Sequence, residues 1–148
     1  LEAEYDHFFN TFILLNPSGK IESNTKIRKE YPASNEAFVF TGYKNEHFIS
    51  TKEFGQIGVA ICYENHLSRF ENEIRYKLNK SEEISMILQP HCAMLMQPMP
   101  MMDQSMCDYC NDELDKLPHA YTKKFGIPTV FCNKSGDMES IIPSGVPT

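Results

Sequence analysis

A short run of apolar residues that ends in a cysteine, Gly58–Glu64 with the sequence GVAICYE, decides the fold expected of this chain. It closes a strand-like segment, Gln56–Tyr63. A second such segment, His47–Thr51, precedes it across a loop whose glycine can supply the positive φ of a hairpin. Apolar residues then recur at spacings of three and four over Asn65–Asn79, which predicts a helix with one buried face. The sequence therefore predicts a strand that breaks sharply into a helix at Cys62.

The rest of the chain alternates between strand-like and helix-like segments. Strands separated by helices, with apolar runs on both faces, are typical of layered proteins, so we expect an α/β fold in one domain spanning 1–148. A Met-rich stretch, Met94–Met106, contains two prolines and predicts a loop with a soft apolar surface. The other predicted elements are strands at Phe8–Asn16, Ile21–Lys29, Ile84–Gln89 and Thr129–Asn133, and a helix at Asn111–Phe125.

Length, composition and charge exclude several classes of protein. The chain has 148 residues, 41% hydrophobic and 23% charged, which is enough material for one globular core. A net charge of −6 leaves no basic stripe for a nucleic-acid backbone. No apolar run is long enough to cross a bilayer, no signal peptide is recognisable, and an odd count of five cysteines argues against a disulfide scaffold. We therefore expect a cytoplasmic protein with no nucleic-acid or membrane partner.

Cys62 and Lys29 are the first candidates for chemistry. A thiol at the point where a strand breaks into a helix can face the first N–H groups of that helix, which favours the nucleophilic thiolate. The alternative is that Cys62 is a small apolar core residue, as most strand cysteines are. Lys29 ends an earlier strand and could donate charge-assisted hydrogen bonds to a developing oxyanion, with Glu36 holding its ammonium group. The alternative for this segment is a solvated strand end.

Together these segments resemble the carbon–nitrogen hydrolase superfamily, which includes nitrilases and aliphatic amidases. The family shows an arginine-lysine strand end, a glutamate several residues later and a Gly-x-x-Ile-Cys-Tyr-Glu nucleophile elbow. Their counterparts here are Lys29 with the arginine before it, Glu36, and Gly58–Glu64. A strand that ends at Pro90, and a Gly-Ile-Pro turn at Gly126–Pro128 before the next strand, are also similar to the family. The resemblance covers most of the chain.

The resemblance implies a four-layer α-β-β-α sandwich, of which this chain covers only part. It also implies a thiol hydrolase that cleaves a non-peptide carbon–nitrogen bond of an amide, carbamoyl or nitrile compound through a cysteine thioester. We expect no metal or cofactor. We expect a homodimer or a larger homo-oligomer. The site residues carried over are Cys62 as nucleophile, Lys29 and the backbone N–H of Tyr63 as oxyanion donors, Glu36 and Glu64 as supporting acids, and Pro90, His91 and Cys92 around the substrate.

The sequence departs from the family at the general base. The family's glutamate lies upstream of the lysine, near the end of the first strand, and Glu2 and Glu4 have no strand before them. The usual lysine-x-His-Leu motif is replaced by Lys29–Pro32 with the sequence KEYP. We therefore expect an internal piece of the family's domain. The alternative function is a catalytically inactive nitrilase-like subunit or binding module. A membrane-linked acyl-transferase branch with the same Cys-Tyr-Glu elbow is a third possibility.

Two further groups of residues could carry different chemistry. Cys107 and Cys110, with Cys92 and His91 nearby, could hold zinc, but a single Cys-x-x-Cys is a weak signal and we expect no metal. His66, four residues after the candidate nucleophile, could serve a Cys-His hydrolase, although an exposed or capping role suits its position better. The Met-rich stretch could form an adaptable apolar lid over the strand ends, or a disordered insertion.

Overall fold

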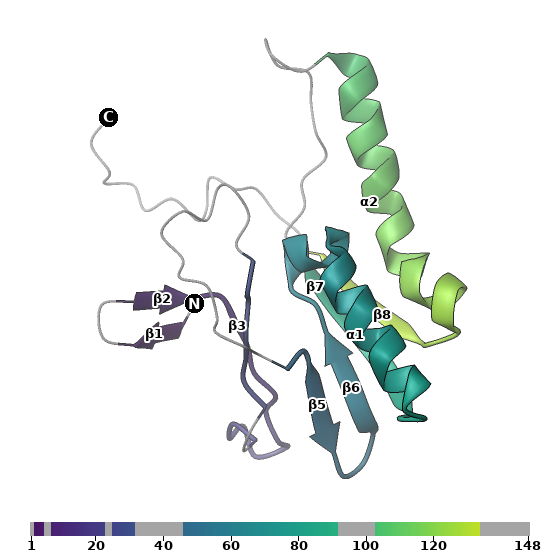
Figure 1. The fold of residues 1–148 in the computed structure, drawn as a ribbon. Coiled ribbons are helices and arrows are strands. Elements are labelled where there is room, and N and C mark those ends of the chain that lie inside the picture. The colour runs from purple at the N-terminus through teal and green to yellow at the C-terminus, as the bar shows by residue number, and fades with distance from the viewer. Residues whose placement is uncertain (1, 5–6, 23–24, 32–45, 92–102, 134–148) are drawn as a thin grey trace, which may run out of the picture.

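The computed structural model describes residues 2–4, 7–22, 25–31, 46–91 and 103–133. A four-stranded mixed sheet forms its centre (Figure 1). The second strand is antiparallel to the first, and the last three are parallel to one another. In spatial order, which is also chain order, the strands are β5 (Phe48–Thr51), β6 (Gly55–Val59), β7 (Ile84–His91) and β8 (Thr129–Asn133). The predicted α/β fold is confirmed.

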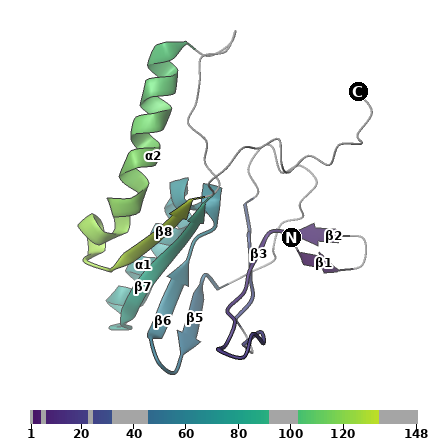
Figure 2. The ribbon, with the colours of Figure 1, turned by 180° about the vertical axis from the view of Figure 1, so that it is seen from behind.

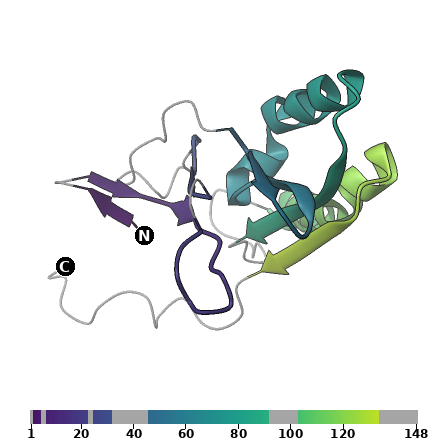
Figure 3. The ribbon, with the colours of Figure 1, turned by 90° about the horizontal axis from the view of Figure 1, so that it is seen from below.

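Two α-helices make the crossover connections that parallel strands require. A 3-10 turn, η1 (Cys62–His66), and helix α1 (Ser68–Asn79) connect β6 to β7, and α2 (Gln104–Phe125) precedes β8. Seen from below, both helices lie on one side of the sheet and the purple N-terminal segment lies on the other (Figure 3). The molecule is therefore layered, with helices on one face of the sheet.

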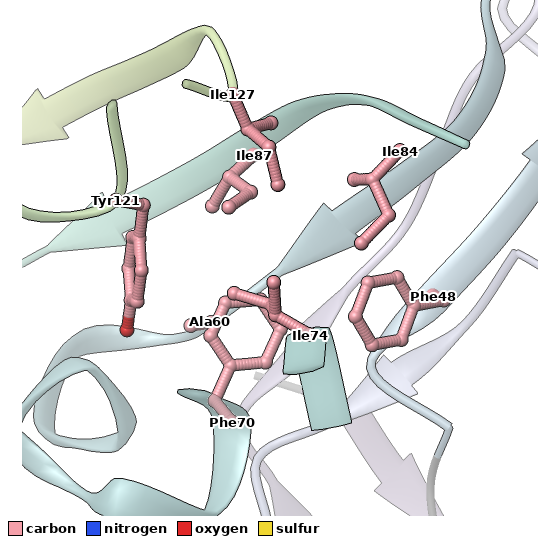
Figure 4. Packing of buried hydrophobic residues seen from close by; sticks show 8 residues of the cluster. All are labelled: Phe48, Ala60, Phe70, Ile74, Ile84, Ile87, Tyr121 and Ile127. Atoms are coloured by element: carbon pink, nitrogen blue, oxygen red, sulfur yellow. The ribbon is translucent and has the colours of Figure 1, made fainter. Parts of the chain in front are cut away.

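A first hydrophobic cluster joins the helices to the sheet (Figure 4). Phe70 of α1 stacks on Phe48 of β5 and meets the ring of Tyr121 of α2 edge-on. Gly58 leaves room for these rings, because a Cβ on it would lie 3.1 Å from atoms of both Phe48 and Phe70. The cluster consists of Phe48, Ala60, Phe70, Ile74, Ile84, Ile87, Tyr121 and Ile127.

A second hydrophobic cluster covers the opposite face of the sheet. A short antiparallel pair, β3 (Thr11–Phe12) and β4 (Ile27–Arg28), packs there through Phe12 and Ile27. Alternation along β6 explains the two faces, since successive side chains of a strand point to opposite sides. The sheet residues of the second cluster are Ile49, Ile57, Val59 and Ile61, and Cys62 packs against them. The candidate nucleophile thus borders the layer that carries Lys29.

The prediction of one buried strand over Phe8–Asn16 is wrong. Instead β1 (Glu2–Glu4) and β2 (His7–Phe9) form a small hairpin, which stands apart from the main sheet in Figures 1 and 2. Phe8 is 47% exposed because β2 pairs with β1 and not with the central sheet. The chain turns directly after Asn16, where the predicted strand was expected to end, and Asn16 Oδ1 accepts hydrogen bonds from the backbone N–H groups of Ser18 and Lys20.

Helix α2 begins seven residues before the predicted Asn111, and the predicted loop over Met94–Met106 is wrong at its last three residues. Asp103 caps the helix, since its carboxylate accepts a hydrogen bond of 2.9 Å from the backbone N–H of Met106. The helix ends where predicted, at Gly126 with φ 71°. Residues 92–102 lie outside the described residues, so the proposed lid is not tested. None of the described helices is both long and apolar enough to cross a membrane.

Candidate active site

Cys62 follows β6 at the carboxyl edge of the sheet and opens the turn η1. Its φ is 52°, in the left-handed region, and in the described part of the chain only Ser81 among the other non-glycine residues has a positive φ. Such a conformation costs about 1–2 kcal/mol for a residue with a Cβ, and strained backbone of this kind is found at nucleophile elbows. Cys62 is a half-buried free thiol, so the sulfur lies at the surface of the second cluster.

The expectation that an α-helix begins directly behind the thiol is wrong. The helix predicted over Asn65–Asn79 starts at Ser68, and a five-residue 3-10 turn lies between. Local side-chain bonds explain the turn. Asn65 donates from Nδ2 to the carbonyl oxygens of Ala60 and Cys62, both at 3.0 Å, and these bonds compete with a helical ladder. Cys62 is therefore held by side chains of its own turn.

Glu64 connects the turn to the strand end that carries Lys29. Its side chain is 2% exposed, and its Oε2 accepts a hydrogen bond of 2.8 Å from the backbone N–H of Ile61. Its Oε1 accepts a second, of 2.6 Å, from the backbone N–H of Glu30. One carboxylate thus binds the residue before Cys62 and the residue after Lys29. The two segments that the sequence singled out are brought together.

Lys29 is fully buried, which is rare for a lysine. Ile27, two residues earlier on the same face of β4, belongs to the cluster that Cys62 borders. Arg28, between them, alternates to the other side and forms an ion pair with Glu4. Glu4, the last residue of β1, is engaged in this ion pair, and its expected unsuitability as a general base stays a prediction.

An ion network extends from the buried Glu64 and His47 to the exposed Arg69. His47 lies just before β5, with Nε2 at 3.4 Å from Glu64 Oε1 and Nδ1 at 2.8 Å from Glu73 Oε2 of α1. Burial favours the neutral ring, but the hydrogen bonds to Glu64 and then Glu73, with their charges, outweigh it and raise the pKa of His47 to about 9. Arg69 completes the network, bonding Glu73 at 3.1 Å and Glu30 at 2.7 Å.

A neutral hydrogen-bond link joins the turn to β7. Gln89, fully buried on that strand, donates from Nε2 to Asn65 Oδ1 at 2.7 Å. Asn65 in turn holds the carbonyl oxygens of the strand end and of Cys62. The amide of a buried residue on β7 therefore fixes the turn.

His91 ends β7 at the same edge of the sheet. It is 8% exposed, and neither ring nitrogen has a hydrogen-bond partner in the described part of the chain. Burial above all, with the charges of His66 and Lys29, lowers the pKa of His91 to about 4. Its ring lies 6.0 Å from the ring of His66 and 5.5 Å from that of Phe131. A neutral imidazole that has no hydrogen-bond partner within 2–4, 7–22, 25–31, 46–91 and 103–133 thus lies at the end of β7.

The other predicted site residues have different surroundings. Tyr63 is exposed and its ring lies 6.0 Å from that of His66, while Pro90 is half-buried beside His91. His66 as a whole residue is exposed, as predicted. Partial burial of its ring lowers its pKa, although the negative charge of Glu113 acts in the opposite direction. Glu36 and Cys92 lie outside the described residues, so their predicted roles remain predictions.

The described residues give no support to the alternative of a zinc site. Cys107 is buried on α2, whereas the side chain of Cys110 and all of Cys92 are outside the described part. Over 2–4, 7–22, 25–31, 46–91 and 103–133 no group of three possible metal ligands occurs. The expected absence of a metal stays a prediction.

Sequence reasoning missed the role of His47 and of Gln89. Both sit next to apolar residues in strand-like runs, where a polar side chain must be either buried with a partner or exposed. The partners come from distant segments, so no spacing in the sequence could indicate them.

Comparisons of the chain with protein-family models and with curated proteins find no match.

Proposed function

We propose that this chain is a thiol hydrolase of the carbon–nitrogen hydrolase type, with Cys62 as nucleophile and Lys29 as oxyanion donor. The observation that supports this best is the Glu64 carboxylate, which binds the backbone beside each of the two residues, at 2.8 Å and 2.6 Å. The left-handed backbone of Cys62 and the burial of Lys29 add to it. Strain and a buried cation are both costly, which favours a functional reason for keeping them.

The proposed reaction proceeds by acyl transfer. The Cys62 thiolate attacks the carbon of an amide or carbamoyl group, a C–S bond forms, and the C=O electron pair moves to oxygen. When this oxyanion collapses, the C–N bond breaks and the amine leaves with a proton from solvent water, which balances the proton that the Cys62 thiol lost on forming its thiolate. Water then adds to the thioester, releasing the acid and the thiol. A nitrile would enter through the corresponding thioimidate and take up a second water. The proton carrier in the family is a glutamate upstream of the lysine.

Stabilisation of the oxyanion would come from two donors. The ammonium of Lys29 and the backbone N–H of Tyr63 would converge on the oxygen, and each such donor contributes about 3–4 kcal/mol in well-studied hydrolases. A buried lysine is suited to this, because its charge acts in a region of low dielectric constant. Glu36 and Glu64 would be supporting acids, with Glu64 holding the backbone through its two hydrogen bonds.

The substrate would lie at the carboxyl edge of the sheet. We propose that Pro90, His91 and Cys92 border it, with the neutral His91 ring hydrogen-bonding to an uncharged polar group of the substrate. The ring nitrogens of His91 have no hydrogen-bond partner among the described residues, which supports this, since buried polar groups ordinarily have partners. The finer fold that we propose is the four-layer α-β-β-α sandwich, with the β3–β4 layer as part of its second sheet. A cytoplasmic homo-oligomer with no cofactor completes the proposal.

Ammonia release from simple compounds tests the proposal. Propionamide, N-carbamoylglycine and propionitrile cover the three substrate classes, and the wild type should release ammonia from at least one. Cys62→Ser should abolish release, whereas the matched variant Cys132→Ser, at an exposed thiol, should not. If the wild type binds these compounds without releasing ammonia, and Cys62 acquires no acyl group detectable by mass spectrometry, the catalytically inactive binding module is the better account.

A further inference from the structure

We propose that His47 is a positioning residue for the Cys62–Lys29 pair, acting as a cation that holds the Glu64 carboxylate in place. This inference rests on the proposed function, because it assigns a role in the same site to a residue that does not touch the substrate. Its basis is the ion network around Glu64, which connects η1 and α1 to the residues just before β5 and just after β4.

The imidazole of His47 lies between two carboxylates. Nδ1 is 2.8 Å from Glu73 of α1, and Nε2 is 3.4 Å from Glu64 of η1. The ring is 2% exposed and stands edge-on to Phe70, with centroids 5.5 Å apart. The His47 carbonyl accepts a hydrogen bond of 2.7 Å from the backbone N–H of Val59, so β6 fixes the residue as well. Both ring nitrogens can donate only when the imidazole is protonated.

The charges around His47 favour this protonated form. Glu64 and Glu73 face it directly, Phe70 adds no charge, and Arg69 stands behind Glu73, bonded to it at 3.1 Å. Although burial acts against protonation, the two carboxylates raise the pKa of His47 to about 9. The site therefore contains a buried cation at neutral pH. It lies against the Glu64 carboxylate, which connects the two halves of the site, the segment of Cys62 and the segment of Lys29.

Loss of this cation should loosen both halves together. A buried carboxylate that loses a cationic partner is strongly destabilised, because the remaining charge is left poorly compensated. Glu64 would then hold the backbone N–H groups of Ile61 and Glu30 less firmly. Cys62 directly follows Ile61 and Lys29 directly precedes Glu30, so the separation of Cys62 and Lys29 would be less well fixed. A misplacement of about 1 Å can cost a hundredfold in rate.

Acylation of Cys62 by 4-nitrophenyl acetate, followed by mass spectrometry between pH 6.5 and 9.5, tests the proposal. In the wild type the acylation rate at saturating probe, corrected for the fraction of Cys62 present as thiolate at each pH, should fall as pH rises through about 9. His47→Gln should lower this rate about tenfold to a hundredfold at pH 7, leave half-saturation unchanged and remove the alkaline decline. Glu73→Gln should shift the decline to lower pH, because one of the two carboxylates that favour the cation is gone.

The matched control is Glu71→Gln. Glu71 lies on the same helix, is 27% exposed against 28% for Glu73, and pairs with Arg75 and Lys124 instead of His47. The Glu71→Gln substitution should leave both the acylation rate and its pH dependence unchanged. A His47→Gln variant that keeps the wild-type rate and the decline near pH 9 overturns the proposal, as does a Glu73→Gln variant with an unshifted decline.

A second readout separates this inference from the proposed function. Hydrogen exchange measured by NMR at pH 7 should show faster exchange of the Ile61 and Glu30 amides in His47→Gln, at both positions and by a similar factor. Unchanged exchange at both overturns the positioning role, whatever the activity. A wild type whose Cys62 is not acylated, but whose two amides respond together to His47→Gln, contradicts the proposed function and supports His47 as the residue that positions Cys62 and Lys29.

Discussion

Glu64→Gln is the substitution whose cost the structure defines most closely. The carboxylate is buried and accepts hydrogen bonds of 2.8 Å from the Ile61 N–H and 2.6 Å from the Glu30 N–H, while His47 faces it at 3.4 Å. A glutamine has the same shape but only one acceptor oxygen. Its NH2 group must confront one of the two backbone N–H donors, which is then buried without a partner.

The expected loss follows from these contacts. A hydrogen bond to a charged group contributes about 1.5–3 kcal/mol, and a buried donor left unsatisfied costs about 1–3 kcal/mol. We therefore expect the free energy of unfolding to fall by about 3–5 kcal/mol, close to the range for breaking a buried ion pair. Total stabilities are about 5–15 kcal/mol, so this single change removes a large part.

Urea unfolding at pH 7, followed by circular dichroism, measures this loss. With an m-value of about 2 kcal/mol per molar urea, the midpoint should move down by about 2 M. Glu113→Gln is the control, because that carboxylate forms an exposed i,i+3 pair with Lys116 and its loss should not move the midpoint. A Glu64→Gln midpoint within 0.5 M, as an order-of-magnitude threshold, at equal m-value refutes the reasoning.

Three further predictions concern stability. The free energy of unfolding should be highest near pH 6.5. The contribution of His47 to stability is fully present below its unfolded pKa of 6.5 and is lost as pH rises through about 9. His91, whose pKa is lowered to about 4, opposes folding as pH falls from 6.5 towards 4. The loss of stability on each side of this maximum should amount to about 3 kcal/mol. Urea midpoints measured across pH should lack the alkaline loss in His47→Gln and the acidic loss in His91→Gln. Gly58→Ala should destabilise by about 1–3 kcal/mol, because its Cβ would press on two buried rings, which thermal unfolding can measure. Cys62→Gly should be at least as stable as Cys62→Ala, since glycine relieves the positive φ; a clear deficit in urea unfolding would show that the backbone there is unstrained.

The central sheet could be predicted from the sequence because its signals are local. Apolar runs bounded by turn residues predicted β5, β6, β7 and β8, and the spacing of apolar residues predicted α1 and the end of α2. The N-terminal prediction was wrong because Phe8 to Leu15 is apolar without being buried. Its exposure depends on which strands pair, and no periodicity encodes that.

The candidate site shows the same division. Cys62 and Lys29 could be singled out by residue type and by resemblance, but not their connection through Glu64, which joins backbone groups far apart in the sequence. The protonated His47 could not be predicted either, since its charge depends on two carboxylates from different elements. The 3-10 turn at Cys62 escaped prediction because it is set by side-chain bonds of Asn65 that override the helical spacing.

The most direct test of the account is the rate at which 4-nitrophenyl acetate acylates Cys62 when Lys29 is replaced by methionine. Removing one oxyanion donor typically costs about 10²–10³ in rate, so Lys29→Met should lower acylation of Cys62 by that factor. Lys26→Met, at an exposed lysine of the same segment, is the control and should acylate like the wild type. Equal rates in the wild type and Lys29→Met would contradict the claim that the buried ammonium serves the Cys62 thiol.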